Sequence, residues 1–149
     1  MIKRIFQLRS RQAGFTLIEL LVVIAIIGLL STLAVVALNN ARQKSRDAKR
    51  VSDIKQIQTA LELYFNDENG YPANITAGSP ITGPNSGVTY MAIVPTNPSP
   101  QTDGNCPTGG YTYSQADSST YSITYCLGGV AGGVTAGTHR ATPAGLVND

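Results

Sequence analysis

The segment between Phe15 and Leu38 constrains this chain more than any other part of the sequence. Its 24 residues are dominated by Leu, Ile, Val and Ala and hold one formal charge, Glu19. As a helix the segment would be about 36 Å long, enough to cross a bilayer hydrocarbon core of roughly 30 Å. The rest of the 149-residue chain is too small and too polar to bury such a helix. The segment therefore predicts a membrane-spanning helix.

A secretory signal peptide is the alternative interpretation of this end of the chain. Residues 1–14 are basic, an apolar stretch follows, and Val35, Val36 and Ala37 would form a tolerable cleavage site. The apolar run is longer than the usual core of a signal peptide, however, and it contains a carboxylate. Both features favour the membrane-spanning helix.

Glu19 is informative because a charge deep in a bilayer costs on the order of 2.5–3.5 kcal/mol and normally has a partner or a function. One interpretation places Glu19 at the interface, where water reaches it. The other depends on a cut after Gly14, which would give Phe15 a positive amine one helical turn from Glu19. Neighbouring subunits would then pair carboxylate with amine, and burying both charges is tolerable only when they meet.

Residues 14–28 read GFTLIELLVVIAIIG and follow a basic segment, 1–14. This stretch resembles the class III signal of type IV prepilins and type II secretion pseudopilins. The resemblance implies cleavage after Gly14 by a prepilin peptidase, N-methylation of Phe15, and a contact of Glu19 that guides assembly. It also implies that the leader lies in the cytoplasm and that the subunit is later extracted from the membrane into a helical filament.

Beyond the membrane the helix is expected to continue as an amphipathic half over residues 39–68. No proline or glycine interrupts residues 29–69, and apolar residues recur at spacings of three and four, the stripe of a helix that packs on one side. Turn formers at 66–70 predict the helix end, with Gly70 at its C-terminus. The stripe consists of Val51, Ile54, Ile57, Leu61, Tyr64 and Phe65, whose two aromatic rings are expected to pack the head onto the helix.

A basic run between residues 42 and 50 is relieved only by Asp47. Without residues 1–14 the chain keeps seven basic and nine acidic side chains, a net charge of −2, which disfavours a generally nucleic-acid-binding protein. We interpret the run as a solvated face outside the bilayer, attracted to lipid headgroups or to acids on neighbouring subunits, and not as a DNA contact, because no aromatic residues interleave it. The run holds Arg42, Lys44, Arg46, Lys49 and Arg50.

The head, residues 69–149, is expected to be rich in loops and to hold a small antiparallel sheet. All eight prolines lie at or beyond Pro72, and a short strand or helical turn is predicted at 90–94. Alternation of large and small residues predicts a hairpin near 111–127, with strands 111–114 and 121–127 joined by a turn at 115–120. Residues 128–137 form a glycine-rich loop, and a third strand is predicted at 138–142.

These observations predict an α+β fold of pilin-like architecture. It comprises the basic leader 1–14, the transmembrane half of the helix 15–38, the amphipathic half 39–68 and the head 69–149. Two further segments, 69–72 (NGYP) and 94–98 (VPTNP), are similar to positions in the G-type major pseudopilins.

Cys106 and Cys126 are the only cysteines, and in an exported domain such a pair predicts a disulfide. Closing about 21 residues would contribute roughly 3 kcal/mol by the loop-entropy model. Many major pilins carry such a bridge, whereas many G-type pseudopilins lack one. A metal site completed by His139 is the alternative, with too few ligands at the wrong spacing.

The resemblance to G-type pseudopilins also implies calcium in a C-terminal loop. The hard oxygen donors available are Asp103, Asp117 and Asp149, and the first two are better explained as turn residues. We therefore assign no metal-binding residue and expect no cofactor other than a possible calcium ion. Asn74 begins a glycosylation sequon on a predicted loop.

Catalysis finds no support in the sequence. His139 is the only histidine and is expected to be a solvated tail residue, and no serine or cysteine has a predictable base partner. The prediction is a structural subunit of a pilus-like filament in the cytoplasmic membrane, and later in the periplasm, cell envelope or an extracellular pilus. Its expected partners are other pilin-like subunits, a prepilin peptidase, the inner-membrane assembly platform and the lipid bilayer.

A G-like pseudopilin that acts in protein secretion is the first choice within this prediction. The alternative is a type IV pilin of a surface fibre for adhesion, motility or DNA uptake, which the cysteine pair favours. A membrane-tethered binding domain that never polymerises is an alternative of another class, and it would retain residues 1–14.

Overall fold

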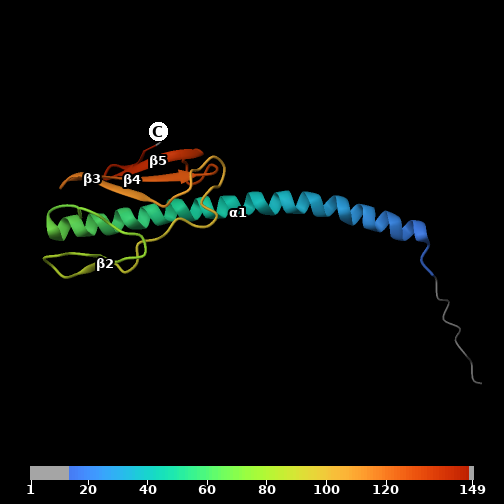
Figure 1. Cartoon of the computed structure of the whole chain (residues 1–149), viewed down its shortest axis with the longest axis horizontal. Coiled ribbons are helices and arrows are strands. Elements are labelled where there is room, and N and C mark those ends of the chain that lie inside the picture. Colours follow the sequence, from blue (N-terminus) through green and yellow to red (C-terminus); the bar gives the residue numbers. More distant parts are fainter. Residues whose placement is uncertain (1–13, 148–149) are drawn as a thin grey trace, which may run out of the picture. The chain divides into compact units, whose positions relative to one another are not determined.

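The computed structural model describes residues 14–147, so the predicted leader lies, apart from Gly14, outside the described residues. The chain divides into two compact units, Met1–Leu38 and Asn39–Asp149. One long N-terminal helix and two small antiparallel sheets give the predicted α+β, pilin-like arrangement. The elements in chain order are α1 (Leu17–Glu68), β1 (Ile81–Thr82), β2 (Thr89–Met91), β3 (Thr112–Asp117), β4 (Thr120–Leu127), β5 (Gly137–Thr142) and β6 (Gly145–Val147) (Figure 1).

The C-terminal end of α1 differs from the prediction in one residue. Asn69, and not Gly70, adopts the left-handed conformation that ends the helix, with a φ of 58°. Its backbone N–H donates to the carbonyl of Phe65 at 2.9 Å. Asparagine tolerates this conformation better than most residues that carry a side chain, which is why the turn-rich segment stops the helix one position earlier than the glycine indicates.

The core of the second unit forms where the predicted helical stripe meets β4. Ile54, Ile57 and Leu61 are fully buried, which confirms the three-and-four spacing read from the sequence. β4 alternates buried and half-buried residues along its length, so one face of the strand packs on the helix. The buried residues of that face are Tyr121, Ile123, Tyr125 and Leu127.

The larger sheet has the order β3-β4-β5-β6, with every neighbouring pair antiparallel. It contains the predicted hairpin and the predicted third strand, β5. The hairpin turn is tighter than the predicted 115–120, because Asp117 pairs with Thr120. The Asp117 carboxylate accepts hydrogen bonds from the N–H and hydroxyl of Ser119 at 2.8 and 2.7 Å, which closes the turn locally. The short edge strand β6 was not predicted.

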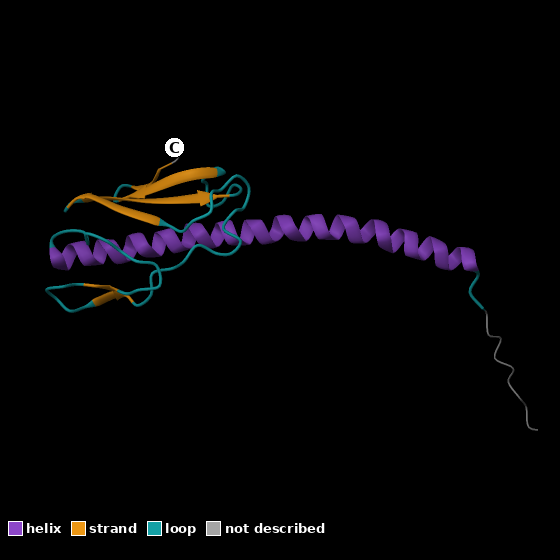
Figure 2. Ribbon diagram, viewed as in Figure 1, coloured by secondary structure: helices purple, strands orange, loops and turns teal. Residues whose placement is uncertain are grey.

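A second, two-stranded sheet lies on the other side of α1 from the larger sheet (Figure 2). Its strand β2, Thr89–Met91, overlaps the predicted segment 90–94 at its first two residues, whereas β1 was not predicted. The Tyr90 ring meets the Tyr64 ring edge-on at a centroid distance of 5.4 Å. The Glu68 carboxylate accepts the backbone N–H of Ser86 at 2.9 Å. The last turn of the helix therefore holds both aromatic and polar contacts with this loop, and Tyr64 packs the head as expected.

Candidate functional site

The start of α1 carries a reciprocal pair of hydrogen bonds between Thr16 and Glu19. The backbone N–H and hydroxyl of Thr16 donate to Glu19 Oε2 at 2.8 and 2.6 Å, and the Glu19 N–H donates to Thr16 Oγ1 at 3.2 Å. This is a capping box, in which two residues three apart satisfy donors that the first helical turn leaves free. Glu19 was predicted from the sequence as a site residue, whereas Thr16 was not, although the Thr-x-x-Glu spacing is that of a capping box.

The apolar part of the helix presents its side chains outward in the described chain. Large apolar residues from Leu17 to Leu38 are about half exposed or more, and Phe15 is 88% exposed. The hydroxyls of Ser31 and Thr32 donate to backbone carbonyls of the same helix at 2.7 and 2.8 Å, so neither needs water. By length and composition this is one helix able to cross a membrane, and it fits membrane anchoring.

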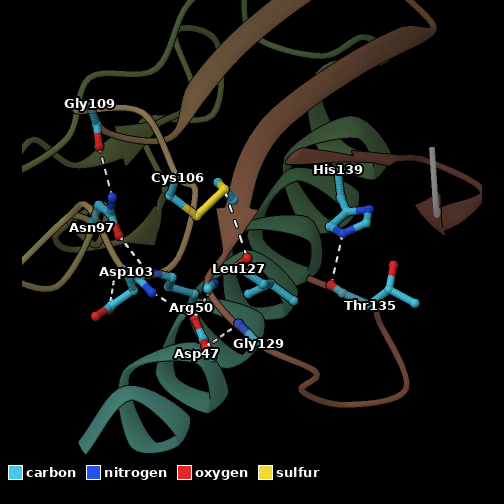
Figure 3. Close-up of a disulfide and its surroundings, with 12 residues drawn as sticks. Asp47, Arg50, Asn97, Asp103, Cys106, Gly109, Leu127, Gly129, Thr135 and His139 are labelled. Atoms are coloured by element: carbon cyan, nitrogen blue, oxygen red, sulfur yellow. Dashed lines mark hydrogen bonds and ion pairs between the residues drawn. A yellow bond between two sulfur atoms is a disulfide. The ribbon is translucent and has the colours of Figure 1, made fainter. Parts of the chain in front are cut away.

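A buried cluster of charges in the second unit centres on Arg50, whose side chain is fully buried. Its guanidinium donates to Asp47 Oδ1 at 2.6 Å, to Asn97 Oδ1 at 2.8 Å and to the Pro100 carbonyl at 3.0 Å. It also lies 2.9 Å from Asp103 Oδ2. Figure 3 shows Arg50 reaching from the helix toward Asn97 and Asp103. One cation of α1 thus holds the loop 97–103.

The two carboxylates of this cluster are fully engaged. Arg46 binds Asp103 through two parallel hydrogen bonds of 2.7 and 2.6 Å, a geometry that is stronger than a single contact. Asp47 accepts the N–H groups of Gly128 and Gly129 at 3.0 and 2.9 Å. Gly128 is required here, because a Cβ at this position would stand 2.6 Å from Asp103 Cβ. Asp103 begins a turn, as predicted, since its carbonyl accepts the Cys106 N–H, but its side chain is also an ion-pair partner, which was not predicted.

The basic run splits into two groups in the structure. Arg46 and Arg50 turn inward to acids of their own chain, so the prediction of a solvated face is wrong for these two residues. Arg42 and Lys44 are exposed, as predicted. The difference arises from Asp103, which lies 57 residues from Arg46, a distance over which helical periodicity carries no information.

Cys106 and Cys126 form the predicted disulfide, with their Cα atoms 5.7 Å apart. The bond joins the loop that follows Asp103 to strand β4, and the Cys106 N–H also donates to the Asp103 carbonyl at 3.1 Å. The loop that presents Asp103 is therefore fixed covalently on one side and by ion pairs on the other.

His139 is not the solvated tail residue that the sequence indicated. It lies on β5 opposite Tyr125, and its side chain is buried. Its Nε2 stands 2.9 Å from the carbonyl oxygen of Thr135 (Figure 3). The strand that holds His139 was predicted, at 138–142, but the burial of this side chain against β4 was not. Because both cysteines are bonded to each other, neither offers a thiolate to a metal beside His139.

The candidate calcium donors do not fit a calcium site. Both oxygens of Asp103 face guanidinium groups, and Asp117 closes its own turn, while Asp149 lies outside the described residues. Calcium takes six to eight oxygen ligands, usually including several carboxylates. Among residues 14–147 there is no group of three or more His, Cys, Asp or Glu side chains that could hold a metal ion.

Comparison with known proteins identifies the same end of the chain. Residues 9–35 match the prokaryotic N-terminal methylation motif. The chain is 34% identical over 101 residues to the type II secretion system core protein G of Vibrio cholerae, an alignment that covers 68% of this chain and 60% of that protein. It is 45% identical over 64 residues to the core protein G of Aeromonas hydrophila, covering 43% of this chain and 45% of the relative.

The matches support the type IV pilin and pseudopilin superfamily. The likeness is to the G-type members, as the segments 69–72 and 94–98 predicted. A third relative, core protein G of Escherichia coli K12, is 38% identical over 89 residues, covering 60% of this chain and 54% of that protein. The chain thus spans between 45% and 60% of the length of these relatives. No solved structure matches it significantly.

The substitution Arg50→Gln is expected to lower the free energy of unfolding of the head by about 3–5 kcal/mol, because it removes the cation from a buried charge cluster. Denaturant unfolding of the detergent-solubilised chain, followed by near-UV circular dichroism of the tyrosines, measures this change. Lys49→Gln is the matched control, since Lys49 is 56% exposed in its pair with Asp53 and such pairs contribute about 0–1 kcal/mol. Equal losses in the two variants would contradict the role of Arg50.

Asp103 is expected to make the head sensitive to acid. The hydrogen bonds from Arg46, ahead of those from Arg50, hold the pKa of Asp103 below its ordinary value of 3.8. Because the folded-state pKa is the lower one, this stabilisation is fully present above pH 3.8 and is lost as the pH falls through the folded-state pKa. Asp103→Asn and Arg46→Gln should each flatten the fall in unfolding free energy between roughly pH 4 and pH 2. Unchanged slopes in both variants would refute this assignment.

Proposed function

We propose that this chain is the structural subunit of a type II secretion-type pseudopilus, made as a membrane-inserted precursor. The observation that carries the proposal is the methylation motif at 9–35, which includes the first 19 residues of an outward-facing apolar helix that begins at Leu17. Similarity to proteins named core protein G supports the secretion-type member of the superfamily. The role is structural and not catalytic.

The processing step of this proposal is cleavage after Gly14, with the leader in the cytoplasm, followed by N-methylation of Phe15. Gly14 lies three residues before the first residue of α1, Leu17, and an added Cβ at this position would have no neighbour within 4 Å. The glycine is therefore not needed for packing within the described chain. A requirement for Gly14 would instead come from a prepilin peptidase that recognises a small residue in an extended conformation before the cleaved bond.

Glu19 is the assembly residue of the proposal. The capping box occupies its Oε2 atom, and its Oε1 atom has no hydrogen-bond partner in the described part of the chain. A neighbouring subunit could place the cleaved amine of its Phe15 at this free oxygen while Thr16 keeps the other. Pairing neutralises both charges within the apolar core of a filament, where side chains of other subunits replace lipid.

Two alternative functions differ from this proposal in the cell fraction where the chain would be found. A surface pilin, which the disulfide favours, would be enriched in fibres sheared from the cell surface, whereas a pseudopilin stays in the cell envelope, on the inner-membrane assembly platform. A non-polymerising tethered domain would keep residues 1–14 and would not enter a filament fraction.

Gly14→Val is expected to abolish processing without altering the fold. In cells that carry a type II secretion prepilin peptidase, intact-mass measurement should find the wild-type chain starting at Phe15 with one added methyl group. The variant should keep all of residues 1–14. Gly28→Ala, which also places a Cβ in open space, is the control and should be processed normally. A wild-type chain that begins at Met1 or after Ala37 would overturn the proposal.

Glu19→Gln is expected to reduce the filament fraction by more than about tenfold, because breaking a buried charge pair costs about 3–5 kcal/mol. Glutamine still serves in a capping box, so the substitution removes the charge and keeps the helix start. Thr16→Ala makes the reverse change and should cost about 0.5–2 kcal/mol of helix stability while it retains assembly. Sedimentation of processed subunits from cell-envelope fractions measures the assembly of both variants. Normal assembly of Glu19→Gln would assign Glu19 to capping alone.

A further inference from the structure

Two cations of the basic run are left free by the structure. Arg46, Lys49 and Arg50 pair with aspartates of their own chain. Arg42 and Lys44 are exposed, and neither makes a hydrogen bond or ion pair within residues 14–147. Asp47, the nearest acid in the sequence, is fully occupied by Arg50 and two backbone N–H groups. The local charge of this helix segment is therefore positive and unneutralised.

Lys44 also lines a shallow hollow on the second unit, with a volume of about 430 Å³. The amide side chains of Asn40 and Gln43 line its helical side, and Gly129 and Val130 line the other. Val130 is 70% exposed, the most exposed large apolar residue of the second unit. The hollow thus combines an ammonium group, two amides and an apolar rim, a set of groups that suits an amphiphilic anion better than a uniformly polar one.

We propose that this hollow binds the phosphate of an anionic phospholipid while the subunit resides in the membrane. The apolar run ends at Leu38, and Arg42 and Lys44 follow it by four and six residues. At 1.5 Å per helical residue this is about 6–9 Å of helix, comparable to the headgroup layer on each side of the hydrocarbon core. A cation near an anionic membrane surface gains binding energy from it.

The inference rests on the membrane-inserted state of the proposed function and not on filament assembly. The lipid site can therefore be tested on the uncut precursor, before any subunit contact forms. An acidic side chain of a neighbouring subunit is the competing partner of the exposed cations. Separate measurements of lipid affinity and of filament assembly distinguish this partner from a lipid phosphate.

Native mass spectrometry of the full-length precursor in mild detergent measures the affinity for added phosphatidylglycerol and for phosphatidylcholine with the same acyl chains. The precursor should bind phosphatidylglycerol more tightly. The variant Lys44→Gln, which removes the only cation that lines the hollow among the described residues, should lower that affinity roughly fivefold and leave phosphatidylcholine unaffected. Lys55→Gln is the matched control, because Lys55 is an exposed cation farther along the helix, and it should bind like the wild type.

Several outcomes would overturn the proposal. Equal affinity for the two lipids, or an equal loss in the Lys55→Gln variant, would show that no specific site exists. Competition by inorganic phosphate at the concentration of the lipid would indicate a simple anion site. A Lys44→Gln variant that binds phosphatidylglycerol normally but fails to enter filaments would assign Lys44 to a contact with a neighbouring subunit. Near-UV circular dichroism of each variant confirms that the head keeps its fold.

Discussion

The head depends on a single buried cation. Arg50 lies on α1 with no exposure to solvent, and removing a charge from water is costly unless ion pairs and hydrogen bonds replace the lost hydration. The structure supplies these partners from Asp47, Asn97, Pro100 and Asp103. The loop 97–103 must therefore lie along the helix. Guanidinium groups neutralise Asp103, which explains why this carboxylate does not suit a calcium ion.

The parts of the molecule that were predictable from sequence are those set by local rules. The apolar run, the helical stripe with Ile57 and Leu61, and the hairpin that contains β4 all follow from periodicity and composition. The burial of Arg50 and His139 did not follow from them, because each depends on contacts with distant segments. His139 is buried only because β5 pairs with β4, and that pairing places a polar residue beside the ring of Tyr125.

The candidate site shows the same division. Residues 14–19 form a contiguous motif, so Gly14, Phe15 and Glu19 were recognisable from the sequence. The hydrogen-bond partner of Glu19 within the chain, Thr16, was not recognised. Thr16 completes the capping box and supplies hydrogen bonds that a hydrocarbon environment would not offer. The two short strands β1 and β6 escaped prediction because two or three residues carry no usable alternation.

The Asp47 contacts also set an order of events during synthesis. Asp47 lies 81 and 82 residues before the two glycines whose N–H groups it binds. A chain that emerges with its N-terminal end first exposes this stretch of helix long before Gly128 and Gly129 leave the ribosome. Its charges must stay hydrated throughout that interval. The head can complete these contacts only after both glycines have emerged.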